Sequence, residues 1–179
     1  MTKEELFKMM NDHPVMHVAT NDNGQPHVRA ILMFKADADG IVFHTGVTKD
    51  LYRQLLNDPR SEVCFACGKY QVRVEGCFEL IEDMALKEEI VNHPSRKFLK
   101  PWREQQGDEA FFSFLKVFRM QHGKAHVWCM DLPPSRARGW ARPPEANCCT
   151  AKRIRCPPKM GNLAHPRAHP SPEAEIQKY

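Results

Sequence analysis

A lysine at an unfavourable place is the first chemical signal in this sequence. The stretch HTGVTKDLYRQL spans residues 44–55 and directly follows an apolar run at 41–43. Apolar residues then recur at helical spacing, which predicts that a strand ends and a helix begins near Lys49. The first turn of a helix has positive partial charge and unpaired N–H groups, which disfavour a cation. A bound phosphate would remove the conflict, because the N–H groups and the lysine ammonium would contact the same anion.

The residues around Lys49 allow two interpretations. Thr48 can supply a hydroxyl, and Gly46 can leave room for a ligand close to the backbone. The alternative is an ordinary helix start, with Thr48 as the N-cap and Lys49 as a solvated side chain, since Thr is a common N-cap.

The elements that must position this loop are short strands. Apolar and polar residues alternate in seven segments, at residues 15–20, 28–34, 41–45, 62–66, 71–81, 111–119 and 124–130. We expect the first three to form an antiparallel meander and the last two a hairpin around residues 121–123. Helices are predicted at the N-terminus, where Thr2 and Glu5 form a capping box, and at about 49–56 and 84–92. This pattern predicts a mainly β fold with peripheral helices (α+β), a small barrel of about six to seven antiparallel strands, since closure removes exposed edges.

The composition changes near residue 131. Residues 133–179 hold nine Lys or Arg against three Glu, and nine of the fourteen prolines. We therefore predict a globular domain at residues 1–131 and a basic, proline-rich, poorly ordered tail at 132–179. The tail contains Cys and His residues, but their spacing matches no familiar zinc pattern, so no metal site is predicted.

The remaining composition indicates a cytoplasmic protein. Apolar residues make up 42% and charged residues 27% of the chain, which is ordinary for a globular domain. No apolar run approaches the roughly 20 residues that span a membrane, and the N-terminus has no signal-peptide pattern. The seven cysteines are scattered without a regular framework, so we expect mostly reduced thiols. Residues 1–132 carry a net charge of −2. The nine basic residues of the tail could touch nucleic acid nonspecifically, but nucleic acid is not an expected partner.

Three stretches, in their order and spacing, resemble the pyridoxamine 5'-phosphate oxidase-like family of FMN-binding split barrels. They are VRAILMF at residues 28–34, VFHTGVTKDLYRQL at 42–55 and KYQVRVEGCFELIED at 69–83. The resemblance covers roughly residues 1–130. It implies a six-stranded split barrel that forms a homodimer, with FMN between the subunits.

The resemblance also implies a set of cofactor-binding residues. In the family, one strand lines the flavin, and here it would carry Arg29, Ala30, Ile31 and Leu32. The end of the next strand, with His44 and Thr45, would give backbone and hydroxyl contacts. The phosphate loop would contain Thr48 and Lys49, and Gln71 would reach FMN from near the subunit interface.

The chain departs from the true vitamin oxidases, which have a Ser-Arg-Lys type phosphate loop and a C-terminal stretch that closes on the substrate. It looks closer to the smaller flavin-reductase-like or general-stress-like members, including those linked to nitroimidazole reduction. We therefore expect a flavoprotein that passes electrons or hydride through FMN to a small molecule, with NADH or NADPH as a candidate reductant. The alternative is a non-enzymatic flavin-binding or regulatory module whose basic tail recruits a partner.

Four further residues have open roles at this point. The candidate proton donors are His13, His17 and His44, although a histidine on a strand is more often simply packed or hydrogen-bonded. Trp102 can either close over the cleft or pack a loop against the barrel.

Overall fold

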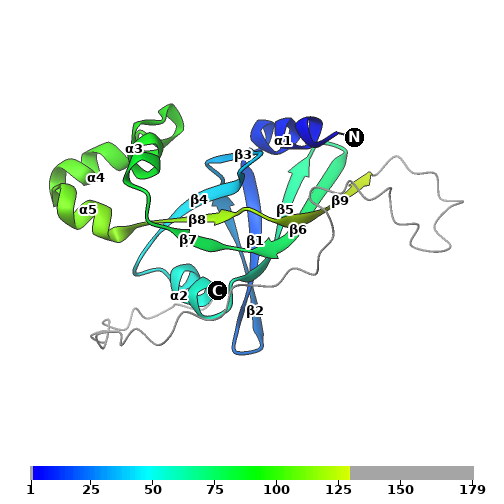
Figure 1. The fold of residues 1–179 in the computed structure, drawn as a ribbon, viewed down its shortest axis with the longest axis horizontal. Coiled ribbons are helices and arrows are strands. Elements are labelled where there is room, and N and C mark those ends of the chain that lie inside the picture. Colours follow the sequence, from blue (N-terminus) through cyan, green and yellow to red (C-terminus); the bar gives the residue numbers. More distant parts are fainter. Residues whose placement is uncertain (1, 130–179) are drawn as a thin grey trace, which may run out of the picture.

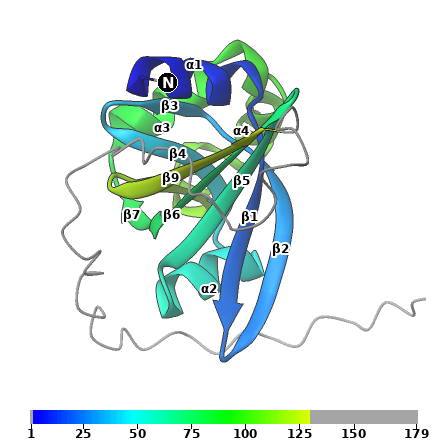
Figure 2. The ribbon, with the colours of Figure 1, turned by 90° about the vertical axis from the view of Figure 1, so that its right-hand side faces the viewer.

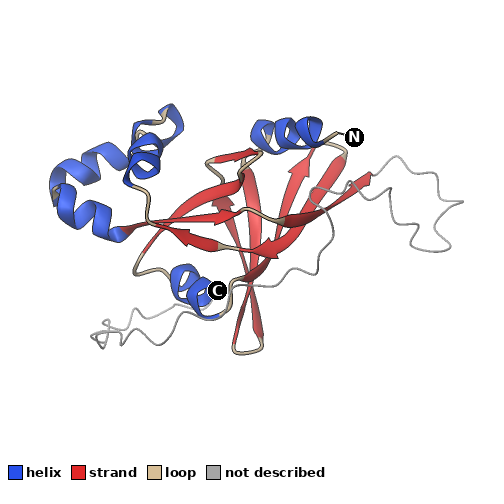
Figure 3. Ribbon diagram, viewed as in Figure 1, coloured by secondary structure: helices blue, strands red, loops and turns tan. Residues whose placement is uncertain are grey.

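The computed structural model describes residues 2–129, which form two antiparallel sheets with helices at two ends and along one side (Figures 1 and 3). The predicted tail at 132–179 lies outside the described residues. The helices are α1 (Lys3–Asp12), α2 (Asp50–Asn57), α3 (Met84–Asn92), the 3₁₀ turn η1 (Pro94–Arg96), α4 (Leu99–Gln106) and α5 (Asp108–Phe114). The strands are β1 (Val15–Asp22), β2 (Gln25–Leu32), β3 (Lys35–Asp37), β4 (Gly40–Gly46), β5 (Arg60–Cys67), β6 (Tyr70–Cys77), β7 (Glu79–Ile81), β8 (Leu115–Met120) and β9 (Gly123–Cys129).

The first sheet has five strands in the order β2-β1-β5-β6-β9, and the second has four in the order β3-β4-β8-β7. The predicted fold class, mainly antiparallel strands with peripheral helices, is confirmed. Hydrogen bonds do not close the two sheets into one continuous barrel. No helix within residues 2–129 is long and apolar enough to cross a membrane.

The chain passes between the sheets directly after β2. The backbone N–H of Met33 donates to Pro14, next to the first sheet, at 2.8 Å, and that of Phe34 donates to Val42 of the second sheet at 2.7 Å. The first pair of the predicted meander is confirmed, since β1 pairs with β2. The third strand of the prediction is wrong, because β4 pairs with β3 and β8 and not with β2. An alternating pattern shows which face of a strand is buried, but it does not identify the strand's partner.

The chain also crosses between the sheets at two other places, and there the structure differs from two other predictions. The long strand expected at 71–81 is divided at Phe78 into β6, in the first sheet, and β7, in the second. The expected hairpin around 121–123 is a crossing as well, since β8 pairs with β4 and β7 while β9 pairs with β6. A Cβ at Gly76 would lie 2.6 Å from the carbonyl oxygen of His122, so glycine is needed where the backbones converge.

The segment before β8 is helical, although the sequence predicts a strand from residue 111. Gly107, with φ at +77°, ends α4, and α5 follows directly. Phe111 and Phe112 are both buried, which a strand covered on one face does not allow for neighbouring residues. Trp102 of α4 packs edge to face against Phe111 and Phe114, so it holds the helical segment together.

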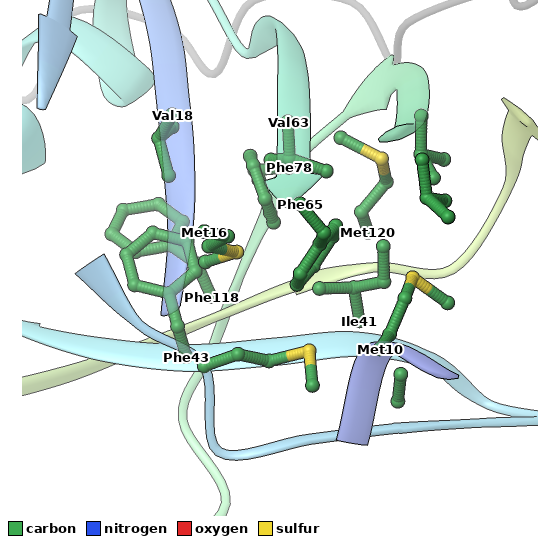
Figure 4. Packing of buried hydrophobic residues seen from close by; sticks show 14 of the residues in the cluster. Met10, Met16, Val18, Ile41, Phe43, Val63, Phe65, Phe78, Phe118 and Met120 are labelled. Carbon is green, nitrogen blue, oxygen red and sulfur yellow. The ribbon is translucent and has the colours of Figure 1, made fainter. Parts of the chain in front are cut away.

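The main core lies between the two sheets and is rich in aromatic and Met side chains (Figure 4). Phe43 of β4 meets the ring of Phe78 edge to face at 4.9 Å and stacks on Phe118 of β8 at 5.7 Å. Met10 of α1 enters the same cluster, so α1 covers one end of the core (Figure 2). A second cluster joins the other face of β4 and β8 to α3, α4 and α5.

We predict that Phe43→Ala lowers the free energy of unfolding by about 3–5 kcal/mol, because it opens a cavity between the sheets. Chemical denaturation of the full chain measures this loss. The matched control is Met84→Ala, at a side chain that is 50% exposed in the first turn of α3, where a change of about 0.5 kcal/mol or less is expected. Equal losses at the two positions would contradict this description of the core.

Candidate cofactor site

The loop between β4 and α2 presents an uncapped helix start. Lys49 is the N-cap residue of α2, and its own backbone N–H donates to the carbonyl of Gly46 at 3.0 Å. No side chain of the described residues caps this helix, so first-turn N–H groups stay available for an external acceptor. The Lys49 side chain is exposed, and Leu51 and Leu55 anchor α2 in the core. Asp50 in the first turn opposes an anion, but it ion-pairs with Arg53 at 3.5 Å.

The loop between β4 and α2 packs against the end of α5. An added Cβ at Gly46 would lie 2.1 Å from the ring of Phe114, and the Val47 N–H donates to the Phe114 carbonyl at 2.9 Å. The space at Gly46, which the sequence assigned to a ligand, is therefore filled by Phe114. Trp102 packs on this ring at 4.5 Å rather than closing over a cleft.

Arg29 of β2 joins a buried polar network beside α2. Its Nη1 and Nη2 atoms donate to Thr20 Oγ1 and Gln54 Oε1, each at 2.7 Å, and the Thr20 hydroxyl donates to the same Gln54 oxygen. Burial lowers the pKa of Arg29, and the charge of Asp50 partly offsets that effect. The structure thus brings Arg29 and the start of α2 into one region of the molecule.

The four predicted residues of β2 face two different ways. Arg29 and Ile31 pair with Val18 and Met16, which are fully buried, and so face the core. Ala30 and Leu32 alternate with them and lie on the outer face of the first sheet.

Gln71 lies on the same outer face, on β6, three strands away from β2. Neighbouring strands lie about 4.8 Å apart, so this separation is roughly 14 Å. Within one chain, the structure therefore does not bring Gln71 to Arg29.

His44 and Thr45 end β4 on opposite faces. Thr45 is half-buried and pairs with Lys116, and His44 accepts a hydrogen bond at Nε2 from Arg96 Nε at 3.0 Å. Burial first, and the charge of Arg96 second, lower the pKa of His44 to about 4. His44 is therefore neutral near pH 7 and is not a proton-donating imidazolium. The sequence gives no signal for Arg96, which stands among polar residues in a segment without periodicity.

A cavity of about 370 Å³ is lined by Thr20, Ser61 and Glu75, among others, but by none of the nine residues implied to bind FMN. A smaller cavity of about 130 Å³ lies against α1 and likewise contains none of the nine. No group of three or more His, Cys, Asp or Glu side chains suited to a metal is present in residues 2–129.

We predict that Gln54→Leu destabilises the protein by about 1–3 kcal/mol, because it leaves Arg29 and Thr20 without their shared acceptor. Gln54→Glu keeps the acceptor oxygens and places a negative charge beside Arg29, so a smaller loss is expected. Thermal and urea unfolding of the two variants test this order, and a more stable Leu variant would contradict it.

Comparisons with known proteins identify the family and the fold of this chain. Residues 2–119 match the family model described as pyridoxamine 5'-phosphate oxidase. A pyridoxine/pyridoxamine 5'-phosphate oxidase of Nitrobacter hamburgensis is 28% identical over 142 residues, covering 76% of this chain and 66% of its own length. This chain thus spans somewhat less than two thirds of that relative.

Two solved structures share the fold at low sequence identity. A NimC/NimA family protein from Clostridium acetobutylicum superposes with a TM-score of 0.57 at 17% identity, over 71% of this chain and 87% of that one. A pyridoxamine 5'-phosphate oxidase-related, FMN-binding protein from Nostoc punctiforme gives 0.55 at 15% identity, over 74% and 86%. With the family match over most of the described residues, the chain belongs to the pyridoxamine 5'-phosphate oxidase family.

Proposed function

We propose that this protein binds FMN and passes electrons or hydride through it to a small molecule, with NADH or NADPH as reductant. Family membership and an FMN-binding structural neighbour support the cofactor. The observation that carries the proposal is the uncapped start of α2 with the exposed Lys49 beside it. A helix start and an ammonium group together recognise a phosphate.

The protein's own residues would bind and orient the cofactor. Lys49, Thr48 and the first-turn N–H groups of α2 would hold the phosphate. Arg29, fixed by Thr20 and Gln54, supplies a second positive charge near α2. The ends of β2 and β4 would form the wall along the ring. When bound, FMN supplies the redox chemistry, so the chain needs no nucleophile or paired carboxylates.

A homodimer would complete this site. Gln71 and Leu32 share the outer face of the first sheet, where four large apolar side chains are exposed: Val15, Val28, Leu32 and Trp128. Exposed apolar groups gathered on one sheet face favour association. Under two-fold symmetry, Gln71 of one subunit could reach the cofactor held by the Arg29 and Lys49 of the other.

We predict that the full-length protein binds FMN more tightly than riboflavin, and that Lys49→Ala lowers FMN affinity about tenfold while leaving riboflavin affinity unchanged. Quenching of flavin fluorescence measures both ligands. The matched control is Lys3→Ala, at an exposed lysine on α1, at the far end of the sheets from α2 (Figure 1). Equal affinity of the unaltered protein for FMN and riboflavin would overturn the phosphate assignment.

A coexpression experiment tests the shared site. Lys49→Ala and Gln71→Ala homodimers should each bind FMN weakly. A mixed dimer contains one site with both native residues, so roughly a quarter of all sites should regain native affinity after random pairing. Recovery of no sites, or a monomeric mass in sedimentation, would show that Gln71 does not act across a dimer.

The alternative function is a flavin-binding regulatory module without turnover. Bleaching of bound FMN by NADH or NADPH, with recovery of its colour on addition of an electron acceptor, favours the enzyme. Tight FMN binding without reduction by any nicotinamide favours the regulatory module.

A further inference from the structure

Arg96 is fully buried, and no carboxylate within residues 2–129 pairs with it. Its side chain, in η1, is 1% exposed, although arginine is almost never buried unless it is paired. Its Nη2 donates to the carbonyls of Leu32 and Met33 at 2.9 and 2.8 Å, and its Nη1 donates to Ser95 Oγ at 3.0 Å. Burial lowers the pKa of its guanidinium. A desolvated cation held by neutral acceptors is costly, which points to a positional role rather than a gain in stability.

The remaining hydrogen bond of Arg96 determines where His44 carries its proton. A guanidinium has donors and no acceptor, so Arg96 Nε must donate to His44 Nε2, at 3.0 Å. His44 Nε2 is then unprotonated, and the ring proton lies on Nδ1. No hydrogen bond from Nδ1 to another group is found within residues 2–129.

The surroundings of His44 favour this neutral form. Its partner across the second sheet is Val117 of β8, and the ring of Phe98, before α4, lies 6.4 Å away. Arg96 is the charged group that acts on His44 among the described residues. A protonated His44 would lose its hydrogen bond and would face this cation at close range.

We propose that Arg96 is a positioning residue that fixes His44 as a neutral Nδ1–H hydrogen-bond donor and ties it to the end of β2. One guanidinium thereby joins two strand ends from different sheets. The statement that these ends line the flavin rests on the proposed function, whereas the fixed tautomer does not. His44 then offers a hydrogen bond to an acceptor atom of a bound heterocycle, and it does not deliver a proton from an imidazolium near pH 7.

Nitrogen-15 NMR of the histidine side chains in full-length protein, without added flavin, tests the tautomer. The His44 signals are assigned by their loss in His44→Phe. We expect the Nδ1–H pattern and no titration of His44 between pH 8 and pH 5. An Nε2–H pattern, or titration near the ordinary value of about 6.5, would overturn the proposal, and this measurement needs no Arg96 variant to fold.

The Arg96→Met variant tests whether Arg96 is what fixes the tautomer of His44. Without the guanidinium, the pKa of His44 should rise toward its ordinary value and the Nδ1–H pattern should weaken. Arg96→Lys keeps the positive charge but not the planar fork of donors, so the Nδ1–H pattern should be only partly restored in that variant. The control is Arg60→Met, at an exposed arginine paired with Asp58, which should leave the His44 signals unchanged. Unchanged His44 signals in Arg96→Met would contradict the proposal.

FMN affinity separates this proposal from the function on which it rests. If Arg96 acts through His44, the losses of affinity in Arg96→Met and His44→Phe should not add in the double variant. Additive losses would contradict action through His44. A protein that shows the fixed tautomer but has no FMN affinity would overturn the proposed function and leave the role of Arg96 in fixing His44 intact.

Discussion

The contact of Phe43 with Phe78 and Phe118 holds the two sheets together and sets the arrangement of the strands around it. Phe43 and Phe118 come from paired strands of the second sheet, and Phe78 lies where the chain leaves the first sheet. The same contact therefore fills the space between the sheets and determines where the chain changes sheet. Such packing is sensitive to volume, because protein interiors are as dense as organic crystals.

This packing determines how β4 presents its end. Phe43 faces the core, so His44, the next residue, must face the helices on the other side of the sheet. Arg96 meets it there and also binds the carbonyls at the end of β2. The ends of β2 and β4 thus belong to different sheets and lie apart in the sequence. The buried side chain of Arg96 joins them.

Charge in this region is arranged around α2. Lys49 is exposed, Arg29 is held by neutral oxygens, and His44 is kept neutral by burial and by Arg96. Lys49 thus stands at the uncapped helix start and Arg29 is bonded to Gln54 of the same helix, whose start would stabilise an anion. Asp50 is the opposing charge, and its pairing with Arg53 reduces that opposition.

Much of the local structure could be predicted because it depends on neighbours in the chain. The capping box of Thr2 and Glu5 is present, with bonds of 2.7 and 3.2 Å, and α3 spans residues 84–92 as predicted. The helix after Lys49 begins within one residue of its predicted start. The family, too, was evident from three short stretches, because it depends on the order and spacing of residues.

The alternation of the strands, the starts of α1, α2 and α3 and the loop at Lys49 were predictable because they arise from contacts a few residues apart. The tertiary structure was needed to show which strands pair, where α4 and α5 form, that the chain crosses between sheets at 33–34, at Phe78 and at 121–122, and that Gln71 lies far from Arg29. It also decided that Arg96 is buried and holds His44. Those outcomes depend on which distant surfaces exclude water together, and no local pattern of residues records that choice.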